Sequence, residues 1–242
     1  MTRWYKDRSG KDAFFLDADA IESTMEGELE KARLMPAAEK PAVDVEAFIE
    51  QYLRLPLDQH ADLPVHILGV TEFERGGRVR IRINRDLSDA LDGEYTNPGT
   101  LGRLRATMAH EASHVVLHRF LYGLEDGQAS LPGVAPSSAP RELQRCAKSA
   151  VVFRGGGSDW KEFQANRGMA ALLMPRRVFA AVAKSEIERL GVGREELEAG
   201  QVPAALLARA LAARFDVSCE AARIRLETLK VVRGAGELDL GI

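Results

Sequence analysis

The chain has 242 residues, of which 45% are hydrophobic and 29% are charged, and its formal net charge is −3. This composition suits a globular protein with a real apolar core, and the net charge excludes an overall basic field that would recruit nucleic acid. The sequence shows no signal peptide and no membrane-spanning segment. Its two cysteines, Cys146 and Cys219, lie too far apart in sequence to suggest a disulfide framework. We therefore expect a cytoplasmic protein.

Residues 1–56 are predicted to form an N-terminal helical arm. Residues 1–16 are only weakly patterned, and we expect them to pack as part of this arm. Residues 17–35 and 43–55 have helical character, the second with apolar side chains at helical spacing, and a proline follows each segment. Both are predicted to be helices.

Two strands are predicted next, at residues 65–73 and 78–84, with a glycine pair between them. The second strand alternates, so that its β-branched residues share one face and its arginines, among them Arg80 and Arg82, share the other. This row of arginines indicates an exposed face or an edge strand. An edge strand beside a cleft can pair with an extended substrate, although ordinary solvated arginines explain the pattern equally well.

Residues 84–99 read as a loop with several turn signals. Tyr95 in this loop could stabilise an oxyanion, although a plain loop tyrosine is the simpler interpretation. A helix is predicted over residues 101–122, and a loop rich in Gly, Pro and Ser follows at 123–140. Residues 141–153 begin with helical character and end in a β-prone run.

The predicted helix at 101–122 carries the motif His110-Glu111-Ala-Ser-His114. Residues four apart lie on one face of a helix, so the two imidazoles point the same way and can share one zinc ion. The carboxylate of Glu111 lies beside the first of them, where it can take a proton from a zinc-activated water. The alternative is two ordinary histidines on an amphipathic helix.

A catalytic zinc needs a third protein ligand, and Glu162 is the candidate. A helix capped by Ser158 or Asp159 is expected to run to residue 174, and it places Glu162 and Asn166 on one face. We expect Glu162 to bind the metal and Asn166 to orient a ligating histidine through its outer nitrogen. Four apolar residues are expected to pack this helix against the predicted helix at 101–122: Phe163, Met169, Leu172 and Leu173.

Three other residues could compete for the metal. Asp159 could replace Glu162, although capping a helix explains it well, and Cys146 could supply an inhibitory thiolate, although a buried free thiol is simpler. His118 continues the histidine row, but it lies one further turn along the helix axis. We therefore expect His118 to be packed or exposed rather than bound to the metal.

The C-terminal region is predicted to contain helices at residues 176–190, 203–214 and 218–231. The last two form a helix-turn-helix outline, in which three basic residues could contact DNA phosphates: Arg223, Arg225 and Lys230. Nearby acidic residues make the local charge modest. A helical subdomain that packs on the rest of the protein, or docks a substrate, is therefore preferred to autonomous DNA binding.

In combination, these motifs resemble those of the ImmA/IrrE metallopeptidase family. The resemblance covers about residues 60–231. It is carried by His110-Glu111-x-x-His114, Glu162-x-Gln164-Ala165-Asn166, the run Ala170-Ala171-Leu172-Leu173-Met174-Pro175, and a tail segment from Phe215 to Leu226.

The resemblance implies an α+β, zincin-like peptidase with a small β-sheet at residues 57–190, followed by a C-terminal helical, helix-turn-helix-like subdomain at 191–242. It implies Zn²⁺ held by His110, His114 and Glu162. It also implies a protein substrate, a helix-turn-helix transcriptional repressor on a separate chain, cut to relieve repression in stress or in mobile-element control. The alternative is a module of the same fold that binds a regulator, or acts in a toxin–antitoxin pair, without cleavage.

Overall fold

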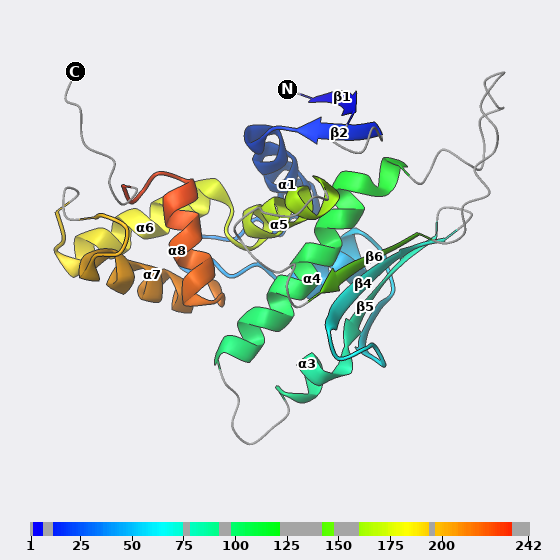
Figure 1. Cartoon of the computed structure of the whole chain (residues 1–242). Coiled ribbons are helices and arrows are strands. Elements are labelled where there is room, and N and C mark those ends of the chain that lie inside the picture. The colour runs from blue at the N-terminus through cyan, green and yellow to red at the C-terminus, as the bar shows by residue number, and fades with distance from the viewer. Residues whose placement is uncertain are drawn as a thin grey trace.

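The structure is a computed structural model that describes residues 2–6, 12–74, 78–91, 98–121, 142–147, 160–193 and 197–233. It has an α+β architecture built around one long helix, α4 (Pro98–His118), as Figure 1 shows. A β-sheet packs on one side of α4, and helices α1 (Ala18–Ala32) and α5 (Trp160–Leu173) lie on the other. The histidine motif is thus at the centre of the molecule.

Within the described residues, the sheet has four strands in the order β3–β5–β4–β6. Strand β5 is parallel to β3, and β4 is antiparallel to both β5 and β6. The bounds are Leu57–Ala61 for β3, Ile67–Phe73 for β4, Val79–Asn84 for β5 and Glu142–Ala147 for β6. The predicted strands at 65–73 and 78–84 are confirmed, whereas β3 was missed and the helical start expected at residue 141 is wrong.

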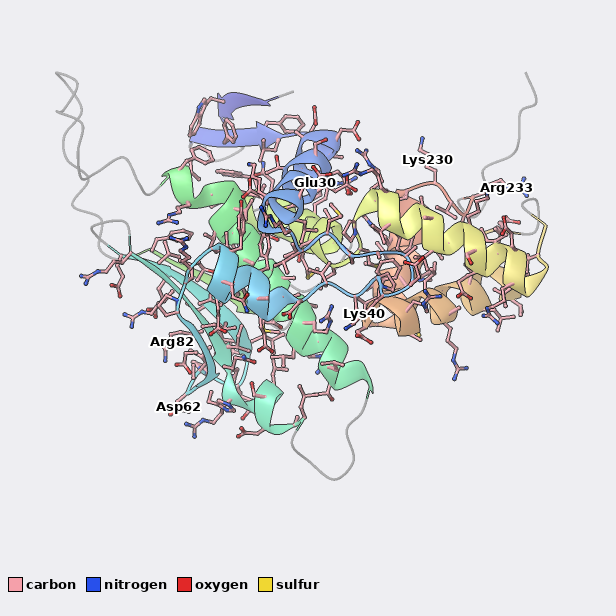
Figure 2. The ribbon with its side chains drawn as sticks, turned by 180° about the vertical axis from the view of Figure 1, so that it is seen from behind. Glu30, Lys40, Asp62, Arg82, Lys230 and Arg233 are labelled. Carbon is pink, nitrogen blue, oxygen red and sulfur yellow. The ribbon has the colours of Figure 1, made fainter. Side chains whose placement is uncertain are left out.

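The predicted alternation of β5 is confirmed, because Val79, Ile81 and Ile83 are buried while the arginines between them face outward. The proposal of an edge strand is wrong, since β5 lies between β3 and β4. Its arginines instead pair across the sheet with the acidic side of β4: Arg80 and Arg82 both bind the buried carboxylate of Glu72. Figure 2 shows Arg82 at the sheet, on the outside of the molecule.

The N-terminal region is more varied than the predicted helical arm. Residues 1–16 contribute an antiparallel hairpin of β1 (Thr2–Lys6) and β2 (Asp12–Leu16). The helix expected at 17–35 is confirmed as α1, whose first turn is capped by the Asp17 carboxylate. The helix expected at 43–55 is shorter, with one turn of α2 (Val45–Ala47) followed by a π-helical turn, η1 (Phe48–Tyr52).

The segment 84–99, predicted to be a loop, begins with a short helix, α3 (Arg85–Asp89). The long helix α4 then starts a few residues earlier than expected and ends in a 3₁₀ turn, η2 (Arg119–Leu121). The apolar side chains of Leu104, Met108, Val115 and Leu117 on α4 are buried, whereas Leu101 is exposed. The loop predicted at 123–140 lies outside the described residues.

The three predicted C-terminal helices are confirmed as α6 (Arg176–Leu190), α7 (Val202–Phe215) and α8 (Cys219–Thr228). The turn between α7 and α8 packs on the start of α4, where a Cβ on Gly102 would lie 3.1 Å from the backbone nitrogen of Ser218. Arg105 reinforces this contact by donating to the backbone oxygen of Asp216. Among the described helices, none has the length and apolar character needed to cross a membrane.

The basic residues considered for DNA contact are largely engaged within the protein. Arg225 is only 2% exposed and binds Glu22 of α1, so the expectation that it could reach a phosphate is wrong. Arg223 pairs with Glu220 and Glu227 on its own helix. Lys230 is exposed, at the end of the molecule formed by the C-terminal helices, as Figure 2 shows.

Candidate metal centre

His110 and His114 project from one face of α4, as their spacing predicts, and both are fully buried. Their Nε2 atoms lie 3.1 Å apart. Helix α4 continues without interruption through both residues, so its backbone keeps the two rings on the same buried face. Two imidazole nitrogens therefore converge on one point.

Glu162, in the first turn of α5, completes the group. Its Oε2 lies 3.1 Å from Nε2 of His110, and its Oε1 lies 3.2 Å from Nε2 of His114. A tetrahedral zinc with bonds of about 2.0–2.1 Å separates its ligands by about 3.3 Å, so the three side chains have the spacing that such an ion requires. Within the described part of the chain, they form the one cluster of His, Cys, Asp or Glu residues suited to a metal.

The charges within the cluster favour a cation. Burial alone would raise the pKa of Glu162, but the hydrogen bonds and charges of the two histidines outweigh it and hold that pKa far below its usual range. Burial likewise acts to lower the pKa of His110, and the carboxylates of Glu162 and Glu111 reverse this and raise it. The carboxylate is thus ionised and ready to bind a metal, which would displace protons from the rings.

Asn166 lies one turn beyond Glu162 on α5, and its Oδ1 is 3.1 Å from Nδ1 of His110. An amide oxygen can only accept, so Nδ1 of His110 carries the hydrogen and Nε2 is directed toward the cluster. This is the contact expected of a residue that orients a metal-binding histidine.

Glu111 is held between α4 and strand β4, and its side chain is completely buried. The hydroxyl of Thr71 donates to its Oε2 at 2.6 Å. Its other oxygen, Oε1, is buried without a hydrogen-bond partner in the structure. A buried carboxylate oxygen without a partner is costly, and next to a metal cluster it is suited to receive a hydrogen bond from a reacting water.

The position of Glu111 depends on a glycine in β4. A Cβ on Gly69 would lie 2.8 Å from Oε1 of Glu111 and 2.8 Å from Cγ2 of Thr107. Only glycine lets the strand approach α4 this closely without displacing the carboxylate. Burial raises the pKa of Glu111 to about 7, opposed by the charge of His110 and the hydrogen bond from Thr71, which brings it near the pH at which a general base works.

The other candidate site residues do not join the metal cluster in the described part of the structure. Arg80 and Arg82 are committed to ion pairs on the sheet, and Tyr95, Asp159 and the side chain of Cys146 lie outside the described residues. Met169, Leu172 and Leu173 of α5 are fully buried, in accord with their predicted packing. Phe163 is 44% exposed, so the same expectation for Phe163 is wrong.

His118 was expected to be either packed or exposed. It is packed, with no exposed surface. Burial and the neighbouring His114 lower its pKa to about 3, so the ring is neutral. Sequence reasoning missed Gly69 and Thr71, which contact Glu111, and Gln164, which contacts His118. The signal available for Thr71 was a hydroxyl in a strand whose other residues, apart from Glu72, are apolar or glycine.

The spacing of α4 and α5 depends on Gly168, which gives a first prediction. A Cβ there would lie 2.9 Å from Cβ of Ser113, an atom fixed to the α4 backbone. In Gly168→Ala the helices must separate, at a cost of about 1–3 kcal/mol in unfolding free energy, and Glu162 must move away from the histidines. We expect a lower zinc affinity, measured by titration against a chelating dye.

Gly27 in α1 provides the matched control, because a Cβ there would meet nothing within 4 Å. Gly27→Ala should leave zinc affinity unchanged and raise the unfolding free energy by about 0.5–1 kcal/mol through helix propensity. Equal zinc affinity in the two alanine variants would contradict the role assigned to Gly168.

Comparison with known proteins gives one family match. Residues 157–227 match the IrrE N-terminal-like domain of the family Peptidase_M78. The matched stretch contains Glu162 and Asn166 and runs through α8, whereas the two histidines lie before it. Comparison with curated proteins gives no match. The family match, on a chain whose fold brings Glu162 against His110 and His114, supports its recognition as an ImmA/IrrE family metallopeptidase.

Proposed function

We propose that this protein is a zinc-dependent endopeptidase whose substrate is a helix-turn-helix transcriptional repressor on a separate chain. The observation that carries the catalytic part is the convergence of His110, His114 and Glu162 beside a buried carboxylate with one oxygen without a partner. The repressor as substrate rests on the resemblance to the ImmA/IrrE family. Relief of repression, in stress or in mobile-element control, is the proposed consequence of the cut.

In the proposed mechanism, the residues of the site have separate roles. His110, His114 and Glu162 would hold the zinc, and Asn166 keeps His110 in the required orientation. When bound, zinc polarises the scissile carbonyl and acidifies a water. Glu111 takes the proton from that water at Oε1, while Thr71 holds Oε2 in place, and the same carboxyl then gives the proton to the departing amine.

The test is to incubate the purified, zinc-loaded protein with the repressor encoded nearest to its gene, and to identify the products by mass spectrometry. We expect cleavage at one peptide bond, which a chelator stops and added zinc restores. Cleavage that continues in the chelator would overturn the metal mechanism. Stable co-elution with the intact repressor would instead support the non-cleaving module. A third outcome is that the protein neither binds nor cuts the repressor but cleaves a proteome-derived peptide library in the presence of zinc. That outcome would overturn the proposed substrate and leave the proposed peptidase activity standing.

A further inference from the structure

A line of buried polar groups continues from His114 of the metal cluster to His118 on α4 and then to Gln164 on α5. Nδ1 of His114 lies 3.1 Å from Nδ1 of His118, and Nε2 of His118 lies 3.1 Å from Oε1 of Gln164. Nε2 of Gln164 then donates at 2.6 Å to the backbone oxygen of Phe14 in β2. The three side chains are at most 3% exposed, so these groups have little access to water.

The last contact determines the direction of every hydrogen bond before it. A backbone carbonyl can only accept, so the amide nitrogen of Gln164 faces Phe14 and its oxygen faces His118. The amide oxygen also only accepts, so Nε2 of His118 carries the hydrogen. A neutral imidazole has one donor and one acceptor. Nδ1 of His118 is therefore the acceptor, and Nδ1 of His114 is the donor.

We infer that His118 and Gln164 are positioning residues that fix His114 with its hydrogen on Nδ1 and its Nε2 lone pair free for the metal. The inference rests on the metal site proposed above and not on the substrate. A neutral imidazole can carry its hydrogen on either nitrogen, and the form with the hydrogen on Nε2 cannot bind zinc through that atom. We call the hydrogen-bonded line of His114, His118, Gln164 and the Phe14 carbonyl the histidine relay. It disfavours the tautomer of His114 that carries its hydrogen on Nε2.

The histidine relay also gives the N-terminal hairpin a role in the site. The hairpin packs on η2, the turn after α4, through three aromatic rings: the ring centroid of Phe14 lies 5.0 Å from that of Phe120 and 5.2 Å from that of Trp4. Edge-to-face and tilted contacts of this kind stabilise a pair of rings beyond the effect of their buried area. The ring of Phe14 thus anchors the strand whose backbone oxygen directs Gln164.

The relay predicts a loss of zinc affinity in His118→Phe, which keeps a ring but removes the acceptor for His114. Removing a partner that orients a metal ligand typically weakens metal binding about 10–100-fold, and we expect a loss in this range when Zn²⁺ alone is titrated against a chelating dye. Gln164→Met, which does not touch a metal ligand, should weaken binding in the same direction but less. Ser113→Ala is the control: it removes a buried hydrogen bond on α4 that goes only to Ala109, and zinc affinity should stay at the wild-type value.

A second measurement needs no variant. In the wild-type protein, long-range ¹H–¹⁵N spectra of the histidine rings should show His118 with its hydrogen on Nε2, with and without zinc. A structural role alone would reduce stability without setting this tautomer. A hydrogen on Nδ1 of His118, or a His118→Phe variant that binds zinc like Ser113→Ala, would overturn the relay. A wild-type protein that binds no zinc would overturn the metal site itself.

Discussion

Glu111→Gln is expected to abolish cleavage while the protein still binds zinc. The amide keeps the hydrogen bond from Thr71, because its oxygen can accept where Oε2 does now. It cannot take a proton from water, however, and a positioned general base contributes about 10²–10⁴-fold to the rate. We expect kcat to fall by at least this factor, measured on a cleaved peptide, with zinc content unchanged. Loss of zinc together with activity would show that Glu111 holds the metal rather than the proton.

The same substitution should stabilise the metal-free protein at neutral and higher pH. Burial raises the pKa of Glu111 from 4.5 to about 7. Between these values the unfolded chain releases a proton that the folded protein keeps, so wild-type stability falls as the pH rises through this window. Above pH 7 the full difference is about 3 kcal/mol, and Glu111→Gln avoids it.

This effect is checked by denaturant unfolding of both metal-free proteins. The variant should be more stable at pH 8, and the two curves should meet near pH 4, where the wild-type carboxyl is protonated in both states. A constant difference across this range would mean that Glu111 ionises in the folded protein as it does in the unfolded chain. Catalysis would then gain nothing from the burial of this residue.

Arg225→Ala is expected to destabilise the fold more than any other substitution considered above. The guanidinium is buried, binds both carboxylate oxygens of Glu22 and donates twice to the backbone oxygen of Met174. Removing one partner of such a pair leaves a buried charge without compensation, which costs about 3–5 kcal/mol. Urea unfolding of the zinc-free proteins measures the difference.

Arg223 lies two residues away and offers a matched control. Its partners Glu220 and Glu227 lie on the same helix and are partly exposed to solvent, so Arg223→Ala should cost less than about 1 kcal/mol. The double variant Glu22→Met with Arg225→Met should recover much of the loss, since an apolar pair leaves no buried charge behind. If Arg225→Ala unfolds in the same urea concentration as Arg223→Ala, the buried pair contributes little.

The parts of the site that follow from local periodicity could be predicted from the sequence. Four-residue spacing alone places His110 with His114 and Glu162 with Asn166, because both pairs lie on uninterrupted helices. The helices α1, α6, α7 and α8 were predicted for a similar reason. In the structure, the hydroxyl of Ser218 caps α8 by accepting from the backbone nitrogen of Ala221. Their ends are determined by caps, glycines and prolines within a few residues.

What could not be predicted depends on partners distant in sequence. Strand β6 has no alternating pattern of its own and exists through pairing with β4, so its sequence was misread as the start of a helix. Thr71 and Gly69 contact Glu111 across 40 or more residues of chain. The role of His118 depends on Gln164 and on a carbonyl of the hairpin, and no spacing on α4 shows either.

The pairing of Glu22 with Arg225 joins positions 203 residues apart, and this has a consequence for the moment at which the protein matures. Chains emerge from the ribosome with the N-terminus first. Met174, which directly follows α5, gains the hydrogen bonds from Arg225 only after α8 has been synthesised. The helix that supplies Glu162 is thus secured only after the C-terminal helices have been made, so the cluster of His110, His114 and Glu162 is completed late in folding.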